Sequence, residues 1–134
     1  MNAYKNVAIQ SGLIVVVDDD DAVRKSLKFS LEVEGYLVRT YGRAEELLKE
    51  PAFPTCRCLV VDQKLPGISG IDLIAKLRDR EILVPAILVA THPSLALRKC
   101  AANVGVTVVE KPLLNSALFD GIRQAMTQSS LPSH

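Results

Sequence analysis

The chain has 134 residues, of which 49% are hydrophobic, and its 16 Lys+Arg and 15 Asp+Glu leave a formal net charge of +1. This length predicts one domain, and the apolar content is sufficient for a buried core, which excludes a disordered chain. The balanced charge gives no signal for nucleic acid or an anionic membrane surface, and the longest apolar run (residues 82–90) is too short to span a bilayer. No secretory signal is visible, so we expect a soluble cytoplasmic domain.

Short apolar runs alternate with amphipathic stretches along the chain, a pattern typical of a parallel α/β sheet. Strands are predicted at Leu13–Val17, Leu37–Tyr41, Cys58–Val61, Ala86–Ala90 and Thr107–Val109. Helices are predicted after the first strand, where Val23, Leu27 and Leu31 recur at helical spacing, then near 44–49, from Ser69 onward, and near 94–103 and 115–127. Right-handed crossovers favour a doubly wound, flavodoxin-like (βα)5 fold with a five-stranded parallel sheet in the order 2-1-3-4-5.

The domain is expected to occupy residues 13–127, with an N-terminal extension at 1–12 and a C-terminal tail at 128–134. Three cysteines cannot form a fully paired disulfide set, which fits a reducing compartment. Cys56 and Cys58 lack a nearby His or further thiols, so we interpret them as buried residues at a strand edge rather than as metal ligands.

Charged residues follow three of the predicted strands. Residues 18–21 are four consecutive aspartates after the first strand, Asp62 follows the third, and Lys111 follows the fifth. Because the carboxyl ends of parallel strands meet at one edge of a sheet, these groups should converge there. The last two aspartates of the run are explained by the start of a helix, where they provide a cap and complement the helix dipole.

Asp18 and Asp19 lie too early to be caps, and placing them beside Asp62 costs several kcal/mol of repulsion unless a cation is bound. Mg²⁺ takes oxygen ligands from a few carboxylates, so the sequence predicts a Mg²⁺ site at this edge. A partly shielded carboxylate such as Asp62 can act as a nucleophile toward phosphorus. Lys111 can then compensate the charge of the transferred phosphoryl group.

Three motifs occur in order along the predicted domain: VVDD at residues 16–19, DQKLPGISG at 62–70 and EKP at 110–112. With these motifs the chain resembles the receiver domains of two-component response regulators, and the stretches at 18–27 and 35–45 are most similar to the nitrogen-fixation-regulator branch. The resemblance implies that Asp62 accepts a phosphoryl group from a phosphohistidine and that Lys111 contacts this group. It also implies a Mg²⁺ site formed by Asp18, Asp19, Asp62 and the main-chain carbonyl of Lys64.

The partners implied by the resemblance are a sensor histidine kinase or phosphotransfer protein and an unknown output protein. The output protein would bind the face formed by the helix near 94–103, the strand at 107–109 and the helix near 115–127. Such a domain signals by protein contact, so we expect neither turnover catalysis nor direct binding to nucleic acid or membrane. A homodimer stays open.

Two positions depart from the family pattern. Ala90 stands where the family has Ser or Thr at the end of the fourth strand, and Val108 stands where it has a switch aromatic. Thr91 is a candidate substitute hydroxyl, but it would face the other side of the sheet if the strand continued. These departures leave open a receiver-like interaction module in which phosphorylation switching is weak or lost. We expect His92, next along this loop, to be a surface residue.

Two other classes of protein fit less well. A haloacid-dehalogenase-type phosphatase would use the D-x-D formed by Asp18 and Asp20, but the chain lacks a paired acidic motif after its late lysine, and Asp62 is left unexplained. A flavin or dinucleotide carrier is disfavoured because no G-x-G-x-x-G follows the first strand and four aspartates would repel phosphate.

Overall fold

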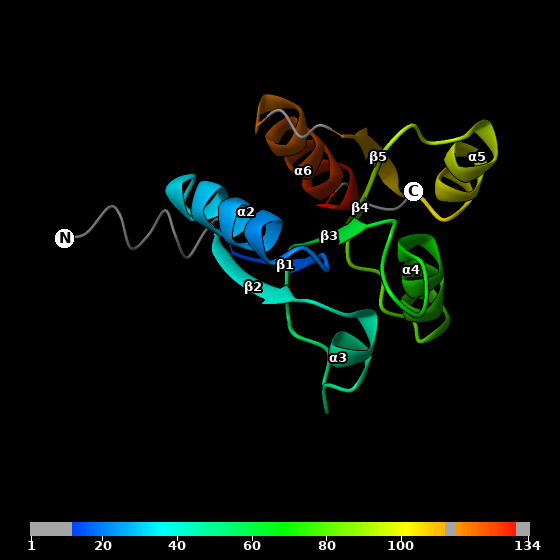
Figure 1. The fold of residues 1–134 in the computed structure, drawn as a ribbon, viewed down its shortest axis with the longest axis horizontal. Helices are drawn as coiled ribbons and strands as arrows, with labels where there is room; N and C mark the ends of the chain where they lie inside the picture. Colours follow the sequence, from blue (N-terminus) through cyan, green and yellow to red (C-terminus); the bar gives the residue numbers. More distant parts are fainter. Residues whose placement is uncertain (1–11, 112–114, 131–134) are drawn as a thin grey trace.

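The structure is a computed structural model, and it describes residues 12–111 and 115–130. Five parallel strands form one sheet in the order β2-β1-β3-β4-β5 (Figure 1). The strands are β1 (Leu13–Val17), β2 (Leu37–Tyr41), β3 (Cys58–Asp62), β4 (Ala86–Ala90) and β5 (Thr107–Glu110). The helices are α2 (Asp21–Val33), α3 (Ala44–Leu48), α4 (Gly70–Asp79), α5 (Leu95–Asn103) and α6 (Asn115–Ser130). The predicted (βα)5 fold and strand order are confirmed.

Most element boundaries lie within a residue or two of their predicted positions. Strands β3 and β5 each continue one residue further than predicted, to Asp62 and Glu110. Helix α6 continues to Ser130, so its predicted end at residue 127 is too early, and the predicted tail begins inside this helix. Residues 1–11, residues 131–134 and Pro112 of the EKP motif lie outside the described residues.

The sheet separates two apolar layers. Along β1, Val15 and Val17 contact the layer that includes α3, α4 and α5, whereas Ile14 and Val16 contact the layer that includes α2 and α6 (Figure 1). This follows from the alternation of side chains along a strand. All five residues of β3 and of β4 are buried, as expected for parallel strands covered on both faces, which explains why β4, and β3 up to Val61, are continuously apolar.

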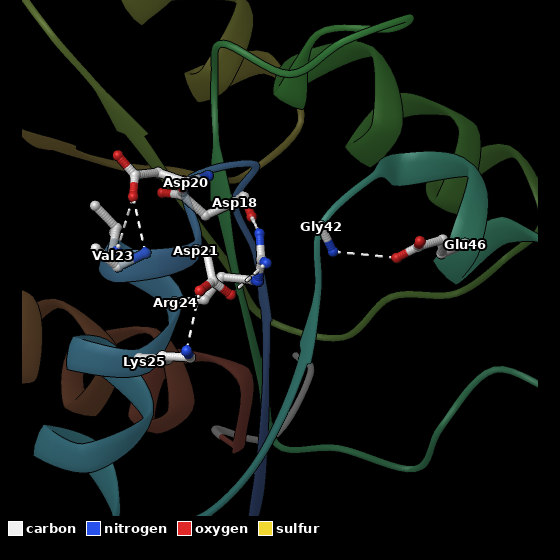
Figure 2. Close-up of polar contacts among 9 residues, drawn as sticks. Asp18, Asp20, Asp21, Val23, Arg24, Lys25, Gly42 and Glu46 are labelled. Carbon is white, nitrogen blue, oxygen red and sulfur yellow. Dashed lines mark hydrogen bonds and ion pairs between the residues drawn. The ribbon is translucent and has the colours of Figure 1, made fainter.

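Side-chain caps fix where the helices begin after the strands. The Asp20 carboxylate accepts hydrogen bonds from the backbone N–H groups of Ala22 (2.9 Å) and Val23 (3.1 Å) (Figure 2). Asp20 therefore caps α2, which starts at the residue after it, Asp21. Ser69, from which this helix was predicted to begin, caps α4 by accepting a hydrogen bond from the backbone N–H of Asp72. Because Asp20 is the cap, the two preceding aspartates are left in the loop at the end of β1. Among the described helices, none is both long and apolar enough to cross a membrane.

Candidate functional site

Two acidic residues are buried in the described part of the chain, and both lie at the carboxyl end of the sheet. Asp18 is 3% exposed and Asp62 is 5% exposed. Asp18 directly follows β1, and Asp62 is the last residue of β3. Since β1 and β3 pair in parallel, with Val17 opposite Val61, the two residues that follow this pair emerge side by side. The sheet register therefore brings the two carboxylates together.

Asp19 completes a cluster of three carboxylates. One carboxylate oxygen from each of Asp18, Asp19 and Asp62 lies within 4.8 Å of the other two, and Asp19 is exposed. Oxygen donors of this kind suit a hard divalent cation, which also relieves the repulsion of burying like charges together. The donor set therefore fits Mg²⁺, with the open side of the cluster at Asp19.

Two hydrogen bonds fix Asp18, one through its backbone and one through its side chain. Its N–H donates to the Tyr41 carbonyl oxygen at the end of β2 (3.1 Å). Its carboxylate Oδ1 accepts from the backbone N–H of Asp20 (2.9 Å). Asp18 thus continues the β1–β2 ladder by one bond and turns its carboxylate over the start of the loop.

Lys111 approaches Asp62 from the far side of β4. Its Nζ lies 3.0 Å from Asp62 Oδ1, and 29% of its side chain is exposed. The Lys111 N–H donates to the Ala90 carbonyl oxygen (2.8 Å), which places the residue at the end of β4. The structure therefore brings together the four residues that the sequence predicted to converge: Asp18, Asp19, Asp62 and Lys111.

Burial and charge act against each other in this cluster. Burial raises the pKa of Asp62, while the hydrogen bond from Lys111 opposes the rise without cancelling it. Burial likewise raises the pKa of Asp18, with a further contribution from the negative charge of Asp62. For Lys111, burial lowers the pKa, but the hydrogen bond and attraction to Asp62 outweigh burial, so the net pKa is raised. Without a metal, the ammonium of Lys111 is the main compensation for the Asp62 charge.

A cavity of about 430 Å³ opens beside Asp62 and Lys111. Its other lining residues are Gln63, Lys64, Ala90, Thr91, His92, Pro93, Ser94 and Leu97. Thr91 is exposed and lines this cavity, because β4 ends at Ala90 and the alternation of a continuing strand does not apply to the next residue. The side chain of His92 is 89% exposed, in agreement with the surface position expected for it.

The remaining predicted positions have distinct surroundings. Lys64 is exposed at the cavity, and the role of its main-chain carbonyl as a metal ligand stays a prediction. Ala90 is buried, and Val108 is half-buried against the apolar layer that includes α5. As the sequence indicates, Ala90 supplies no hydroxyl and Val108 supplies no aromatic ring. Cys58 is buried and Cys56 is half-buried, close to the interpretation given for this pair.

Sequence reasoning missed how the loop after Asp62 is held. Gly70 N–H donates to the Gln63 carbonyl oxygen (3.0 Å), and Ile71 N–H donates to Gln63 Oε1 (2.9 Å). A Cβ on Gly70 would lie only 2.5 Å from the Asp62 carbonyl oxygen, so this position needs glycine for close approach. The sequence held one signal, a glycine at the first position of a helix. Glycine loses more conformational entropy than other residues when it enters a helix, so its presence there indicates a need for close approach.

Comparison with known proteins agrees with this geometry. The sequence profile described as the response regulator receiver domain matches residues 14–123. The transcriptional regulatory protein FixJ of Azorhizobium caulinodans is 35% identical over 117 residues, which cover 86% of this chain and 55% of that protein. FixJ of Rhizobium meliloti is 32% identical over 111 residues, covering 82% of this chain and 54% of that protein. The chain therefore spans about half the length of these curated relatives.

A solved structure supports the same assignment. The crystal structure of a CheY-like response regulator receiver domain protein from Methanospirillum hungatei JF-1 matches with a TM-score of 0.79 and 29% sequence identity. The match covers 87% of this chain and 94% of that one. The similarity to FixJ confirms the predicted resemblance to the nitrogen-fixation-regulator branch.

Proposed function

This chain belongs to the response regulator receiver domain family of two-component signalling, and from this premise we propose that it accepts a phosphoryl group from a phosphohistidine onto Asp62. The observation that carries the proposal is the position of Asp62. Its carboxylate is buried at a strand end, is hydrogen-bonded to the Lys111 ammonium and opens onto a cavity.

In the proposed step, a carboxylate oxygen of Asp62 attacks the phosphorus of a phosphohistidine and forms the P–O bond of an acyl phosphate. The P–N bond breaks, and the imidazole nitrogen leaves with the electron pair and takes a proton. Lys111 favours the ionised form of Asp62 before the attack and can contact the phosphoryl oxygens afterwards, because it lies against Asp62 and lines the same cavity. The domain receives and holds one group, so we propose a signalling role rather than multiple-turnover catalysis.

Asp18, Asp19 and Asp62 would hold the Mg²⁺, with the Lys64 carbonyl as the further ligand implied by the family resemblance. When bound, Mg²⁺ supplies positive charge that offsets the carboxylates and the phosphoryl oxygens. The cavity beside Asp62 is lined by Lys111 and Thr91, and Asp18 and Asp19 are not among its described lining residues. Asp62 belongs to both the cavity lining and the carboxylate cluster, so the space for the phosphoryl group would adjoin the metal site at this residue.

The test is treatment of the whole chain with acetyl phosphate and Mg²⁺, followed by intact-mass measurement. We expect one added phosphoryl group that hydroxylamine removes, since an acyl phosphate is labile to this nucleophile. Asp62→Asn and a chelator should each abolish the addition, and Asp72→Asn is the matched control because Asp72 is an exposed aspartate on α4. Equal labelling of Asp62→Asn would overturn the proposal.

For the partners, we propose a histidine kinase or phosphotransfer protein as the donor and an output protein that binds the α5–β5–α6 face. A second candidate function is favoured by Ala90 and Val108, which lack the hydroxyl and the ring of the family pattern. In that case the domain binds its partner with little dependence on phosphorylation. Partner binding measured with and without acetyl phosphate separates the two.

A further inference from the structure

Arg24 lies between the acidic loop and the edge of the sheet (Figure 2). Its Nη1 donates to the main-chain carbonyl oxygen of Asp18 (2.6 Å), and its Nη2 donates to the Asp21 carboxylate (2.9 Å). Only 19% of the Arg24 side chain is exposed, although α2 is a surface helix. The guanidinium is therefore fixed in place rather than extended into solvent.

The bond to Asp18 acts on the peptide group that joins Asp18 to Asp19. The N–H of Asp18 is already bonded to Tyr41, so Arg24 fixes the other side of the same residue. Asp19 has an exposed side chain, and the peptide group that precedes it is the one that Arg24 bonds. Arg24 thus holds the backbone next to the residue at the open side of the carboxylate cluster.

Gly42 makes the room that Arg24 needs. It directly follows β2, and a Cβ on Gly42 would lie 3.1 Å from Arg24 Nη1 and 3.5 Å from Cζ. Gly42 is not among the glycines with positive φ, so contact with Arg24, and not backbone conformation, disfavours a side chain here. The Gly42 N–H donates to Glu46 Oε1 (3.1 Å), which holds the glycine in position (Figure 2).

We propose that Arg24 is a positioning residue for the Mg²⁺ site and that Gly42 is the glycine that admits it. The proposal rests on the proposed function, in which Asp18, Asp19 and Asp62 hold the metal. Arg24 bonds to a carbonyl oxygen and to Asp21, so its charge does not occupy the carboxylates that the metal needs. Groups that orient metal ligands in this way contribute to affinity without touching the metal.

Positioning and simple charge make opposite predictions for Arg24→Ala. Removing a positive charge beside three carboxylates would strengthen cation binding by Coulomb attraction. Loss of positioning instead raises the Mg²⁺ Kd, by about 10- to 100-fold. Isothermal titration calorimetry of the metal-free whole chain with Mg²⁺ measures this Kd, at a temperature below the melting temperature of each variant.

Lys25→Ala is the matched control. Lys25 contacts the same Asp21 carboxylate (3.1 Å), but its side chain is 78% exposed and no contact with Asp18 is found for it within the described residues. This variant removes the same charge from the same turn of α2, and its Mg²⁺ Kd should be unchanged or slightly lower. An equal loss of affinity in Lys25→Ala and Arg24→Ala would overturn the proposal.

Gly42→Val tests the contact from the other side. It should weaken Mg²⁺ binding in the wild-type background and add little in Arg24→Ala, because the two changes disturb one contact. If Gly42→Val does not fold, alone or combined with Arg24→Ala, Gly42→Ala is the milder substitution. We expect it to weaken Mg²⁺ affinity several-fold. Backbone amide shifts of Asp18 and Asp19 in the metal-free chain should change in all three variants and not in Lys25→Ala.

Wild-type affinity in Arg24→Ala, or fully additive losses in the double variant, would overturn the inference. The outcomes for the wild-type chain distinguish this inference from the proposed function. A wild-type chain that binds Mg²⁺ but is not phosphorylated overturns only the proposed function. A wild-type chain that does not bind Mg²⁺ overturns both the metal site and the role of Arg24.

Discussion

The Lys111–Asp62 ion pair crosses the end of β4. Asp62 belongs to β3 and Lys111 follows β5, and these strands lie on either side of β4 in the sheet. The crossing occurs beside Ala90, whose carbonyl oxygen accepts from the Lys111 N–H. Ala90 also lines the cavity beside the ion pair, so a larger side chain at this position should affect the space around Asp62 and Lys111.

Lys111→Ala should slow phosphorylation of Asp62 by acetyl phosphate by about 10- to 100-fold, the equivalent of a charge-assisted hydrogen bond of about 1.5–3 kcal/mol. The reason is that Lys111 is the main group that opposes the rise in the Asp62 pKa, ahead of a backbone hydrogen bond from Gln63. Lys64→Ala is the control, because it removes an exposed cavity-lining ammonium and keeps the main-chain carbonyl. Initial rates from intact mass measure the effect, and equal slowing by the two variants would contradict the role of Lys111.

Asp18→Asn should raise the melting temperature of the metal-free chain at neutral pH by a few degrees. Burial raises the pKa of Asp18 above its ordinary value of 3.8, so the folded state binds this proton more strongly than the unfolded state. Such a group costs stability once the pH rises through its folded pKa, and the cost is absent below 3.8. Thermal unfolding with a chelator, from pH 3.5 to 7.5, should show the gain only at the higher pH values, and exposed Asp79→Asn should show none. A gain that is independent of pH would argue against charge as its cause.

Mg²⁺ should stabilise the folded chain in the absence of any phosphoryl donor. Binding only to the folded state gives about 2.7 kcal/mol at a Mg²⁺ concentration about 100 times Kd. Asp19→Ala should abolish the Mg²⁺-dependent rise in melting temperature, because Asp19 contributes one of the three clustered carboxylates. If wild-type melting is the same in Mg²⁺ and in a chelator, the metal site is wrong.

Phosphorylation should shift the α5–β5–α6 face less than in a receiver with the family pattern. A ligand shifts a conformational equilibrium only by its different affinity for the two states. Ala90 lacks a hydroxyl that would bond the phosphoryl group, which removes about 1.5–3 kcal/mol, or roughly ten- to a hundredfold in the population ratio. Amide shifts on addition of beryllofluoride should therefore be larger in Ala90→Thr than in the wild-type chain.

Thr91→Ala is the control for this last measurement, because Thr91 lines the cavity and carries the neighbouring hydroxyl. If Thr91 replaces the missing contact, Thr91→Ala reduces the wild-type shifts across residues 95–127. Large wild-type shifts that Thr91→Ala leaves unchanged would show that switching needs neither hydroxyl.

The three thiols should react with iodoacetamide in the order of their exposure. Cys100 is exposed on α5 and should be modified first in the native chain. Burial raises the pKa of Cys56 to about 11 and of Cys58 to about 12, so neither provides thiolate at neutral pH. Peptide mapping after timed labelling checks the order, with Cys58 modified only under unfolding conditions. Rapid native labelling of Cys58 would contradict the burial of β3.

The strands could be predicted because β3 and β4 are covered on both faces and therefore read as unbroken apolar runs. The convergence of Asp62 and Lys111 followed from one rule, that residues after parallel strands meet at the same edge. Contacts to the main chain could not be predicted in this way. The bond from Arg24 to the Asp18 carbonyl oxygen depends on the spacing of two elements, and a carbonyl group carries no mark of its partner in the sequence.

The place of Thr91 at the cavity depends on where β4 ends. Alternation along a strand holds only as far as the strand continues, and β4 ends one residue earlier, at Ala90. Element ends are the least certain part of any assignment from sequence, and a functional side chain placed directly after one inherits that uncertainty. The predicted position of Asp62 depended less on where its strand ends, because Asp62 is the last residue of β3 and keeps the register of the strand.

The close approach of Gly70 to the Asp62 carbonyl oxygen bears on how this domain can be divided for engineering. Helix α4 looks like an interchangeable segment that begins at its cap, Ser69, but its first residue closely approaches the backbone of Asp62, and its first turn is bonded to Gln63. A chimera joined at Ser69 would separate the first turn of α4 from the Asp62–Gln63 segment that it contacts. A graft that exchanges α4 should therefore start within β3, before Asp62, so that Asp62, the loop after it and the helix are transferred as one piece.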